Sequence, residues 1–253
     1  MNKKLFNIKN FVTIVTGSGR GIGLEIATGF YKYGAKVVRI DINLKKHKLY
    51  KFDDHKIDLR KQKLVDQCLH EIKRRYGRID VLINNAGVTT YNLNNKVSKT
   101  ILYDEKILKE TLSVNLIAAY NLSNKVCKTM SKRKKGSIIN ITSLAAERGF
   151  IGNPSYQVSK AGLKQLTKAL ACDWGQKNIR INNVCPGYIK TPMTLRSFKN
   201  SKLKKNRDTR MILKRWGEPK DLVGPCIFLA SDSSSYITGS DIFVDGGWLA
   251  KGL

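Results

Sequence analysis

The sequence predicts an α/β fold built on one doubly wound parallel sheet, with helices on both faces. Two observations lead to this fold class. Short β-branched apolar runs alternate with longer amphipathic stretches along the chain, an order typical of parallel strands joined by right-handed helical crossovers. A glycine-rich turn also lies between the first apolar run and the first amphipathic stretch. A strand, a turn and a helix in that order begin a βαβ unit.

The expected elements follow one another without a linker, an internal repeat or a low-complexity segment. Apolar runs predict strands at residues 11–16, 36–40, 79–84, 136–142, 179–184 and 241–244. Amphipathic spacing predicts helices at residues 22–33, 60–76, 104–130, 155–177 and 219–231. A length of 253 residues suits one α/β unit of this kind, so we expect residues 1–253 to form a single domain.

The glycine-rich turn has the spacing Gly17-x-x-x-Gly21-x-Gly23. The first glycine permits a tight turn, and the later two let the backbone approach a pyrophosphate closely. The helix that follows offers free N–H groups and the positive end of its dipole to phosphate. Such a turn can also be a plain loop, and its spacing differs from the commoner Gly-x-Gly-x-x-Gly pattern. We interpret it as a dinucleotide site formed by Gly17, Ser18, Arg20, Gly21, Ile22 and Gly23.

Asp41 ends the second predicted strand, about 20 residues after the glycines. An acidic residue at this point hydrogen-bonds the ribose hydroxyls, and its charge would repel a 2′-phosphate. Arg20 and Arg39 favour the opposite choice, because a nearby arginine can hold that phosphate. Alternation along the strand could, however, turn Arg39 away. We therefore expect NAD as the cofactor, with NADP as the less favoured alternative.

Tyr156 and Lys160 are four residues apart on a predicted helix. This spacing places the phenol and the ammonium on one helix face, one turn apart. A neighbouring ammonium stabilises phenolate, so we expect the tyrosine pKa to fall from about 10 toward neutrality. A tyrosine tuned in this way can exchange a proton with a substrate hydroxyl at physiological pH. A Tyr-x-x-x-Lys pair on its own can also arise by chance on a helix surface.

The chain resembles the classical short-chain dehydrogenase/reductase family over essentially its whole length. The resemblance rests on motifs in the family's order: the cofactor motif at residues 16–23, the signature at residues 84–87, Asn115, Ser143, the pair Tyr156 and Lys160, and the Pro-Gly motif at residues 186–191. Ser143 precedes Tyr156 by thirteen residues, the usual distance in the family. The resemblance implies a Rossmann-fold oxidoreductase that transfers a hydride between NAD(H) and a secondary alcohol or ketone.

The resemblance also implies a role for each site residue. Tyr156 would be the general acid/base, and Ser143 would hold the substrate oxygen within its reach. Lys160 would lower the tyrosine pKa and bind the nicotinamide ribose, while Asn115 would hold a water on a proton path to solvent. Asp58 would cap the adenine. The remaining cofactor contacts would be Leu59, Asn85, Ala86, Gly87, Pro186, Gly187, Ile189 and Thr191, together with Tyr156 and Lys160. The family is usually tetrameric, so we expect a homotetramer.

The chain carries 47 lysine and arginine residues against 19 aspartate and glutamate residues, a formal net charge of +28. Such an excess can indicate binding to nucleic acid or to a membrane surface. The lysines are, however, spread along the whole chain, and the densest run, residues 131–135, follows a predicted helix at the sheet edge opposite the ligand-binding edge. No aromatic residues interleave with it to stack on bases. We expect no specific nucleic-acid partner.

Membrane, disulfide and metal sites are not indicated. No stretch is apolar and long enough to span a bilayer, and the first residues lack a signal peptide. We therefore expect a cytoplasmic protein with no membrane partner. The five cysteines have no Cys-x-x-Cys spacing, and this indicates reduced thiols. The three histidines form no ligand cluster, so we expect no metal.

Two segments are expected to cover the substrate pocket, residues 88–103 and residues 192–216. The second is strongly basic and would suit an anionic substrate, although it could simply share the general lysine excess. Residues 211–219 and 244–250 resemble the sugar-acid branch of the family, which includes gluconate 5-dehydrogenase and 2-deoxy-D-gluconate 3-dehydrogenase. We expect a sugar acid bound by Ser143, Tyr156 and a candidate carboxylate partner, Arg148.

Two alternatives stay open. An NADPH-dependent 3-oxoacyl-carrier-protein reductase would also suit a basic surface and Arg20, because its carrier protein is acidic; Asp41 argues against it. A catalytically silent dinucleotide-binding scaffold is the alternative from another class of protein. The complete set of four catalytic residues argues against a scaffold.

Overall fold

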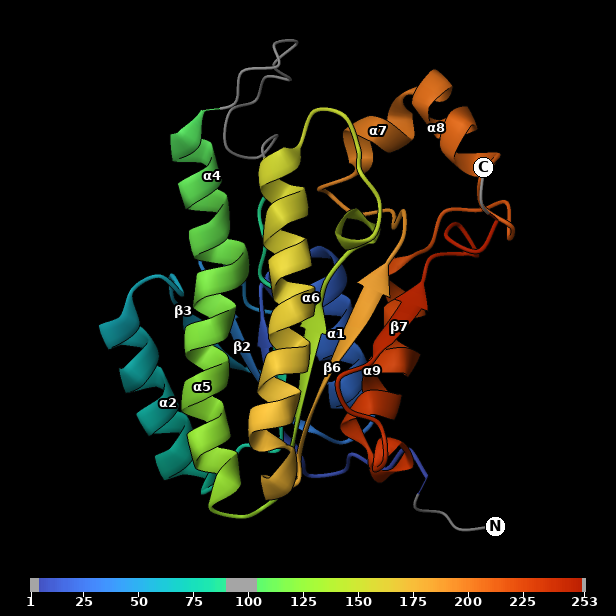
Figure 1. The fold of residues 1–253 in the computed structure, drawn as a ribbon. Helices are drawn as coiled ribbons and strands as arrows, with labels where there is room; N and C mark the ends of the chain where they lie inside the picture. The colour runs from blue at the N-terminus through green and yellow to red at the C-terminus, as the bar shows by residue number, and fades with distance from the viewer. Residues whose placement is uncertain (1–4, 90–103, 252–253) are drawn as a thin grey trace.

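The computed structural model of the protein describes residues 5–89 and 104–251. Within these ranges, seven strands form one sheet in which every neighbouring pair is parallel, in the order β3-β2-β1-β4-β5-β6-β7. The strands are β1 Val12–Thr16, β2 Lys36–Asp41, β3 Asp53–Lys56, β4 Val81–Asn84, β5 Gly136–Ile141, β6 Ile179–Pro186 and β7 Asp241–Val244. The chain winds outward in both directions from β1 and β4 (Figure 1). The predicted doubly wound fold is therefore confirmed.

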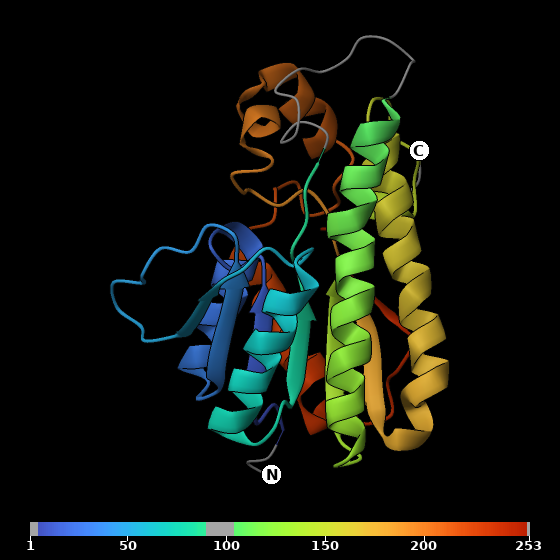
Figure 2. The same cartoon turned by 90° about the vertical axis from the view of Figure 1, so that its left-hand side faces the viewer.

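Helices cover both faces of the sheet (Figures 1 and 2). One face carries α1 Gly21–Lys32 and α9 Val223–Ala230, and the other carries α2 Gln62–Tyr76, α4 Glu105–Leu112, α5 Ala118–Ser131 and α6 Pro154–Trp174. A π-helical segment, Ser113–Ile117, joins α4 to α5. Short 3-10 turns lie at Leu144–Ala146, Gly175–Lys177, Pro219–Leu222 and Asp232–Ser234. Two further helices, α7 Leu195–Lys199 and α8 Ser201–Asp208, lie beyond the carboxyl end of β6 (Figure 1).

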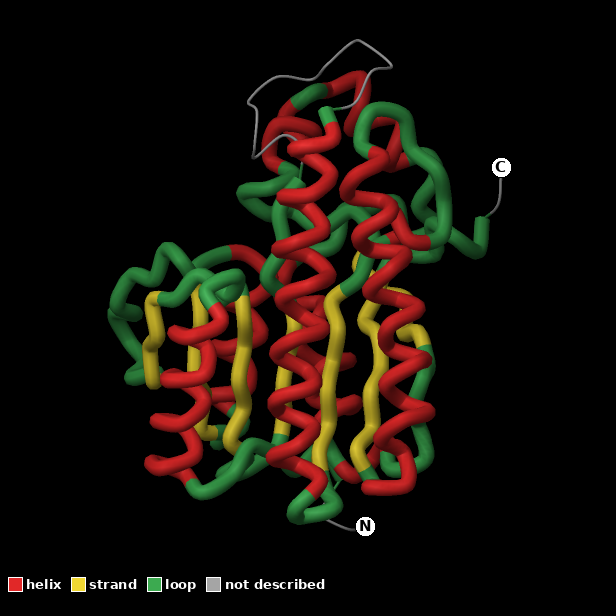
Figure 3. The backbone as a smooth tube through the Cα atoms, turned by 60° about the vertical axis from the view of Figure 1, so that its left-hand side comes forward, coloured by secondary structure: helices red, strands yellow, loops and turns green. Residues whose placement is uncertain are grey.

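The central strands are apolar runs because both of their faces are covered. All residues of β1, β4 and β5 are buried. One apolar core, which includes Phe30 and Leu222, lies between the sheet and the layer of α1 and α9. A second core, which includes Ile72, Leu122 and Leu170, lies under α2, α5 and α6. The two cores hold the sheet rigid, and the loops at its carboxyl edge are built on that support (Figure 3).

Helix ends follow local chemistry. Pro154 occupies the first turn of α6, where its missing N–H costs nothing. The side chain of Asp104 accepts the N–H of Lys106 and caps α4. Gly77 ends α2 in the left-handed region at φ 71°, a conformation that glycine adopts without strain. Pro154 thus fixes the start of α6, and with it the position of the residues that follow on this helix.

The structure differs from the sequence-based expectations in three places. The sequence does not predict β3, because its residues are polar and show no apolar alternation. Pairing with β2 at the sheet edge forms this strand, and there Arg39 lies opposite Asp54. The helix expected at 104–130 is interrupted by the π-helical segment. Residues 192–216, for which the sequence predicts no helix, contain α7 and α8. Most of the other predicted lid, residues 90–103, lies outside the described residues.

Candidate active site

The start of α1 is open to an anion. Arg20 precedes the helix in an extended conformation, and no side chain caps the first turn or adds an acidic group to it. The first N–H groups of a helix have no partner within the helix, so an oxygen-rich ligand has to supply the acceptors. Gly21, the first helical residue, has φ +60°, which a side chain would strain. This end of α1 therefore fits a phosphate group of a dinucleotide.

The glycine turn is packed tightly against the loop that follows β4. A Cβ placed on Gly17 would lie 2.6 Å from the Cα of Ala86, so only glycine fits there. The hydroxyl of Thr16 accepts the N–H groups of Asn85, at 3.0 Å, and of Ala86, at 3.1 Å. The side chain of Asn85 donates to the carbonyls of Thr16 and Gly17. The hydroxyl of Ser18 donates to a main-chain carbonyl, at 2.9 Å. These bonds place the two predicted cofactor loops side by side.

The carboxylate of Asp41 lies directly beside the glycine turn. It accepts the N–H groups of Gly19 and Asn43, each at 2.8 Å. It therefore sits at the position at which an acidic residue meets the adenosine ribose in dinucleotide folds. Arg39 is turned away from this position, as strand alternation allows: it is buried, donates twice to Asp54 at 2.8 and 2.5 Å, and stacks on Phe52. Arg39 is consequently not available to a 2′-phosphate.

The other predicted cofactor residues lie in loops at the same edge of the sheet. Asp58 follows β3 and pairs with Arg60 at 2.7 Å, and this guanidinium holds the pKa of the Asp58 carboxyl below its usual range. The neighbouring Leu59 is half-buried, and its carbonyl accepts a hydrogen bond from Gln62. Because Asp58 is already paired, a contact with adenine would be made beside this ion pair.

The loop after β6 meets the glycine turn. A Cβ placed on Gly21 would lie 3.8 Å from the Cβ of Thr191, so these two predicted cofactor residues are neighbours. The N–H of Thr191 donates to the hydroxyl of Thr194 at 3.0 Å, which holds the loop in shape. Pro186 and Ile189 are buried, and a Cβ on Gly187 would lie 2.7 Å from the Cα of Asp245. Tight packing therefore fixes the Pro-Gly segment.

The predicted acid/base residues come together where α6 passes the carboxyl end of β5. Tyr156 and Lys160 lie one turn apart on α6, and the Lys160 amine is 5.8 Å from the centre of the Tyr156 ring. Lys160 is only 4% exposed, and its amine donates to the carbonyl of Ile141 at 2.7 Å. Ser143 begins the turn after β5, and its hydroxyl lies close enough to the phenol of Tyr156 to lower the pKa of that phenol. The structure thus brings Ser143, Tyr156 and Lys160 into one site.

The fourth member of the set is placed by the π-helical segment. Asn115 is buried within Ser113–Ile117, where a π-helical turn often marks a functional position. Its side chain exchanges two hydrogen bonds with the backbone of Val88, at 2.8 and 3.0 Å, and donates to Ser159 at 2.9 Å. A Cβ on Gly87 would lie 3.5 Å from the Asn115 oxygen and 3.6 Å from the Lys160 amine. Asn115 and Lys160 therefore flank the same glycine.

The comparisons with known proteins agree with this geometry. A family model described as enoyl-(acyl carrier protein) reductase matches residues 17–249. The chain is 32% identical to 5-keto-D-gluconate 5-reductase of Escherichia coli (strain K12), with 97% of this chain and 98% of the relative aligned. It is 34% identical to a 3-oxoacyl-[acyl-carrier-protein] reductase of Thermotoga maritima, over 93% and 96% of the two chains.

A solved structure extends the likeness to three dimensions. The gluconate 5-dehydrogenase of Burkholderia cenocepacia J2315, in complex with NADP and tartrate, matches with a TM-score of 0.90 and 30% identity, over 98% of each chain. The chain belongs to the short-chain dehydrogenase/reductase family. It is therefore an oxidoreductase that acts on CH–OH groups with NAD or NADP. The family that the motifs indicated is confirmed.

One electrostatic expectation for this dehydrogenase is wrong in the structure described. Burial raises the pKa of Tyr156, and the hydrogen bond from Ser143 lowers it by less. Burial also lowers the pKa of Lys160 to about 8. The expected lowering of the Tyr156 pKa by Lys160 is not found, because both groups are desolvated and the lysine amine is directed to the Ile141 carbonyl.

Two residues of the dehydrogenase that sequence reasoning missed position the site. Ser159 holds the side chain of Asn115, and its place three residues after Tyr156 on a helix was the available signal. Gln157 exchanges two hydrogen bonds with the backbone of Phe150, both at 2.7 Å, and so fixes the loop between Ser143 and Tyr156. Arg148, the predicted carboxylate partner, lies on that loop and is exposed.

Residues 5–89 and 104–251 contain neither a metal cluster nor a membrane-spanning helix. No group of three or more His, Cys, Asp or Glu side chains there could hold a metal ion. No helix in these ranges combines the length and the apolar composition needed to cross a bilayer.

Proposed function

We propose that this dehydrogenase interconverts a secondary alcohol and a ketone on a sugar acid of the gluconate type. The observation that carries the proposal is one assembled site: Ser143, Tyr156, Lys160 and Asn115 lie together at the loop of Ala86 and Gly87, which packs against the glycine turn. The similarity to 5-keto-D-gluconate 5-reductase and to gluconate 5-dehydrogenase supports the substrate class. The basic segment over the site supports an anionic substrate.

The roles of the four side chains follow from their contacts. A nicotinamide dinucleotide would supply or accept the hydride when bound at the glycine turn. Ser143 would hydrogen-bond the substrate oxygen, and Tyr156 would give a proton to it in reduction or take one in oxidation. Lys160 would bind ribose hydroxyls, and Asn115 would hold the loop at Gly87 beside it. Burial raises the pKa of Tyr156, so the neutral phenol would be the proton donor in reduction.

We further propose NAD as the preferred cofactor, with NADP as the alternative. Asp41 beside the glycine turn favours NAD, and the engagement of Arg39 with Asp54 removes one possible phosphate ligand. Arg20 is exposed next to the turn and could hold a 2′-phosphate. The NADP bound to the Burkholderia relative favours the alternative. Parallel measurements with NADH and NADPH decide between them.

A second candidate function is reduction of a 3-oxoacyl thioester. The 34% identity to the Thermotoga reductase favours it. The deciding experiment measures reduction of 5-keto-D-gluconate and of an acetoacetyl thioester, each with NADH and with NADPH. We expect turnover of the sugar acid. Turnover of the thioester alone would replace the first candidate by the second, and no turnover across a broad ketone panel would favour a silent dinucleotide-binding scaffold.

We propose a homotetramer in the cytoplasm as the working form. Three apolar side chains are each about half exposed: Ile117 in the π-helical segment (50%), Tyr120 on α5 (47%) and Val158 on α6 (54%). Their exposure supports burial against another subunit. All five cysteines are free thiols, and this supports a reducing compartment. Light scattering of the purified protein measures the assembly, for which a monomer of 28.5 kDa is the reference.

A further inference from the structure

Arg207 on α8 differs from the other arginines that are not exposed, because it has no hydrogen-bond or ion-pair partner among the described residues. Among the described residues, Arg39, Arg78, Arg180 and Arg207 are the arginines that are not exposed. Arg78 pairs with Asp80 at 2.9 Å. Arg39 donates to Asp54, and Arg180 donates to Ser234 at 2.7 Å and to a carbonyl at 3.1 Å. No described residue accepts a hydrogen bond from Arg207 or forms an ion pair with it. The five N–H donors of this half-buried guanidinium are therefore left to water or to a ligand.

Aromatic rings fix the position of this guanidinium. It lies 4.6 Å from the centre of the Tyr188 ring and 5.7 Å from that of Trp216. Contact with the ring faces orients the planar group and leaves its N–H edges free to donate. A planar fork of donors matches the two oxygens of a carboxylate.

The surroundings of Arg207 contain further donors without acceptors. Trp216 and Trp248 are only 6% and 8% exposed, and the indole N–H of each is buried without a hydrogen-bond partner among the described residues. The neighbouring acidic group, Asp208, is paired with Lys204 at 2.5 Å, although its second oxygen is buried without a partner. The Arg207 guanidinium thus lies beside Trp216, and both tryptophans pack against Tyr188. This region has the composition of a site for a ligand rich in anionic and hydroxyl oxygens.

The aromatic wall is continuous with the catalytic residues. Tyr188 follows Gly187 of the Pro-Gly segment and packs against Trp216 at 5.3 Å and Trp248 at 6.2 Å. Trp248 contacts Phe150 at 5.7 Å, on the loop that Gln157 fixes. Leu144, directly after Ser143, belongs to the same apolar cluster as the two tryptophans. The wall therefore extends from the hydrogen-bonding serine to Arg207.

We propose that Arg207 binds the carboxylate of the substrate and thereby selects acids over neutral sugars. This inference rests on the proposed function and names Arg207, rather than the exposed Arg148, as the carboxylate partner. The aromatic wall orients the guanidinium, and the indole N–H groups meet oxygens of the same ligand. The ketone end of the substrate then lies at Ser143 and Tyr156.

The test compares an acid with a neutral analogue. L-sorbose has the carbon skeleton of 5-keto-D-gluconate, with a hydroxymethyl group in place of the carboxylate. Arg207→Gln should raise KM for 5-keto-D-gluconate about 10- to 100-fold, the value of a charge-assisted hydrogen-bonded pair, while kcat and the KM for L-sorbose stay nearly unchanged. Arg210→Gln removes the same charge from a nearby exposed position and should change neither KM. Equal effects on the two sugars, or equal effects of the two variants, would overturn the proposal.

A binding measurement separates this inference from the proposed function. Gluconate and its neutral analogue glucitol are titrated by calorimetry into enzyme loaded with reduced cofactor, with which neither can react. Wild type and Arg210→Gln should bind gluconate at least about tenfold more tightly than glucitol, and Arg207→Gln should lose this preference. If wild type reduces no sugar acid, the proposed function fails and this titration alone decides Arg207. A wild type that does not prefer gluconate, or a preference that survives Arg207→Gln, refutes the carboxylate site.

Discussion

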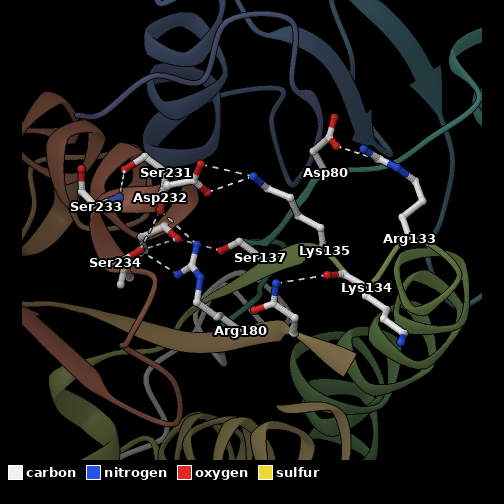
Figure 4. Close-up of polar contacts among 12 residues, drawn as sticks. Asp80, Arg133, Lys134, Lys135, Ser137, Arg180, Ser231, Asp232, Ser233 and Ser234 are labelled. Atoms are coloured by element: carbon white, nitrogen blue, oxygen red, sulfur yellow. Dashed lines mark hydrogen bonds and ion pairs between the residues drawn. The ribbon is translucent and has the colours of Figure 1, made fainter. Parts of the chain in front are cut away.

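The two ends of the strands in this sheet, here called the amino edge and the carboxyl edge, differ in how nearby polar groups are satisfied. At the amino edge, Arg133 pairs with Asp80 at 2.8 Å, and Arg180 donates to Ser234 (Figure 4). Lys135 pairs there with an aspartate at 3.0 Å. At the carboxyl edge, the start of α1 has no side-chain cap, and Arg207 has no acceptor among the described residues. Paired groups stabilise the fold at one edge, and unpaired donors mark a ligand site at the other.

The comparison also explains the densest basic run, residues 131–135. Two of its cations are engaged with acidic groups of the chain itself, which agrees with a structural role at the amino edge. Its position between α5 and β5 confirms that it lies away from the carboxyl ends of the strands. A high local charge therefore does not by itself identify a binding surface; the absence of an internal partner is more informative.

The largest expected effect is at the carboxyl edge. Tyr156→Phe should lower kcat about a thousandfold, because it removes the group that transfers the proton, while the affinity for the dinucleotide stays nearly unchanged. In the wild type, oxidation of the alcohol should accelerate as the pH rises above neutrality, since Tyr156, whose pKa is raised, has to lose its proton to act as the base. Steady-state rates and cofactor titration measure both. A variant that kept more than about a tenth of the rate would show that another group is the acid/base.

At the amino edge, Asp80→Ala should reduce the free energy of unfolding by about 3 kcal/mol, as expected for breaking a buried ion pair. Asp80 is 7% exposed, pairs with Arg78 at 2.9 Å, and accepts hydrogen bonds from Arg133 and from the N–H of Val12. Urea titration measures the loss, and kcat of the folded variant should stay close to that of wild type. The matched control is Asp232→Ala, whose exposed pair should cost less than about 1 kcal/mol. Equal losses of unfolding free energy in Asp80→Ala and Asp232→Ala would contradict the expected difference between the buried pair and the exposed pair.

The smallest expected effect concerns cofactor choice. Asp41→Ala should raise KM for NAD about tenfold and lower KM for NADP, because the carboxylate both binds the ribose hydroxyls and repels a 2′-phosphate. Arg39→Gln serves as the contrast, because Arg39 is tied to Asp54 and should affect stability and not the cofactor ratio. An unchanged NAD to NADP ratio in Asp41→Ala would place Asp41 outside the ribose contact.

Local patterns in the sequence determined much of this protein. The apolar strands, the glycine turn and the spacing of Tyr156 and Lys160 depend on backbone sterics and side-chain periodicity, which act within a few residues. The family and the doubly wound parallel fold followed from these patterns. The sequence left open on which face of its strand the Arg39 side chain lies, because alternation along a strand allows either face.

Tertiary structure decided the rest, because burial and partners depend on residues far apart in the chain. β3 forms by pairing with its neighbouring strand at the sheet edge, and the π-helical segment that carries Asn115 is not apparent in the spacing of apolar residues. The pKa shifts of Tyr156 and Lys160 arise from desolvation, which no sequence window reports. The sequence marked a basic segment over the site, but only the folded chain shows that Arg207 is half-buried against Tyr188 and Trp216, without an acceptor among the described residues.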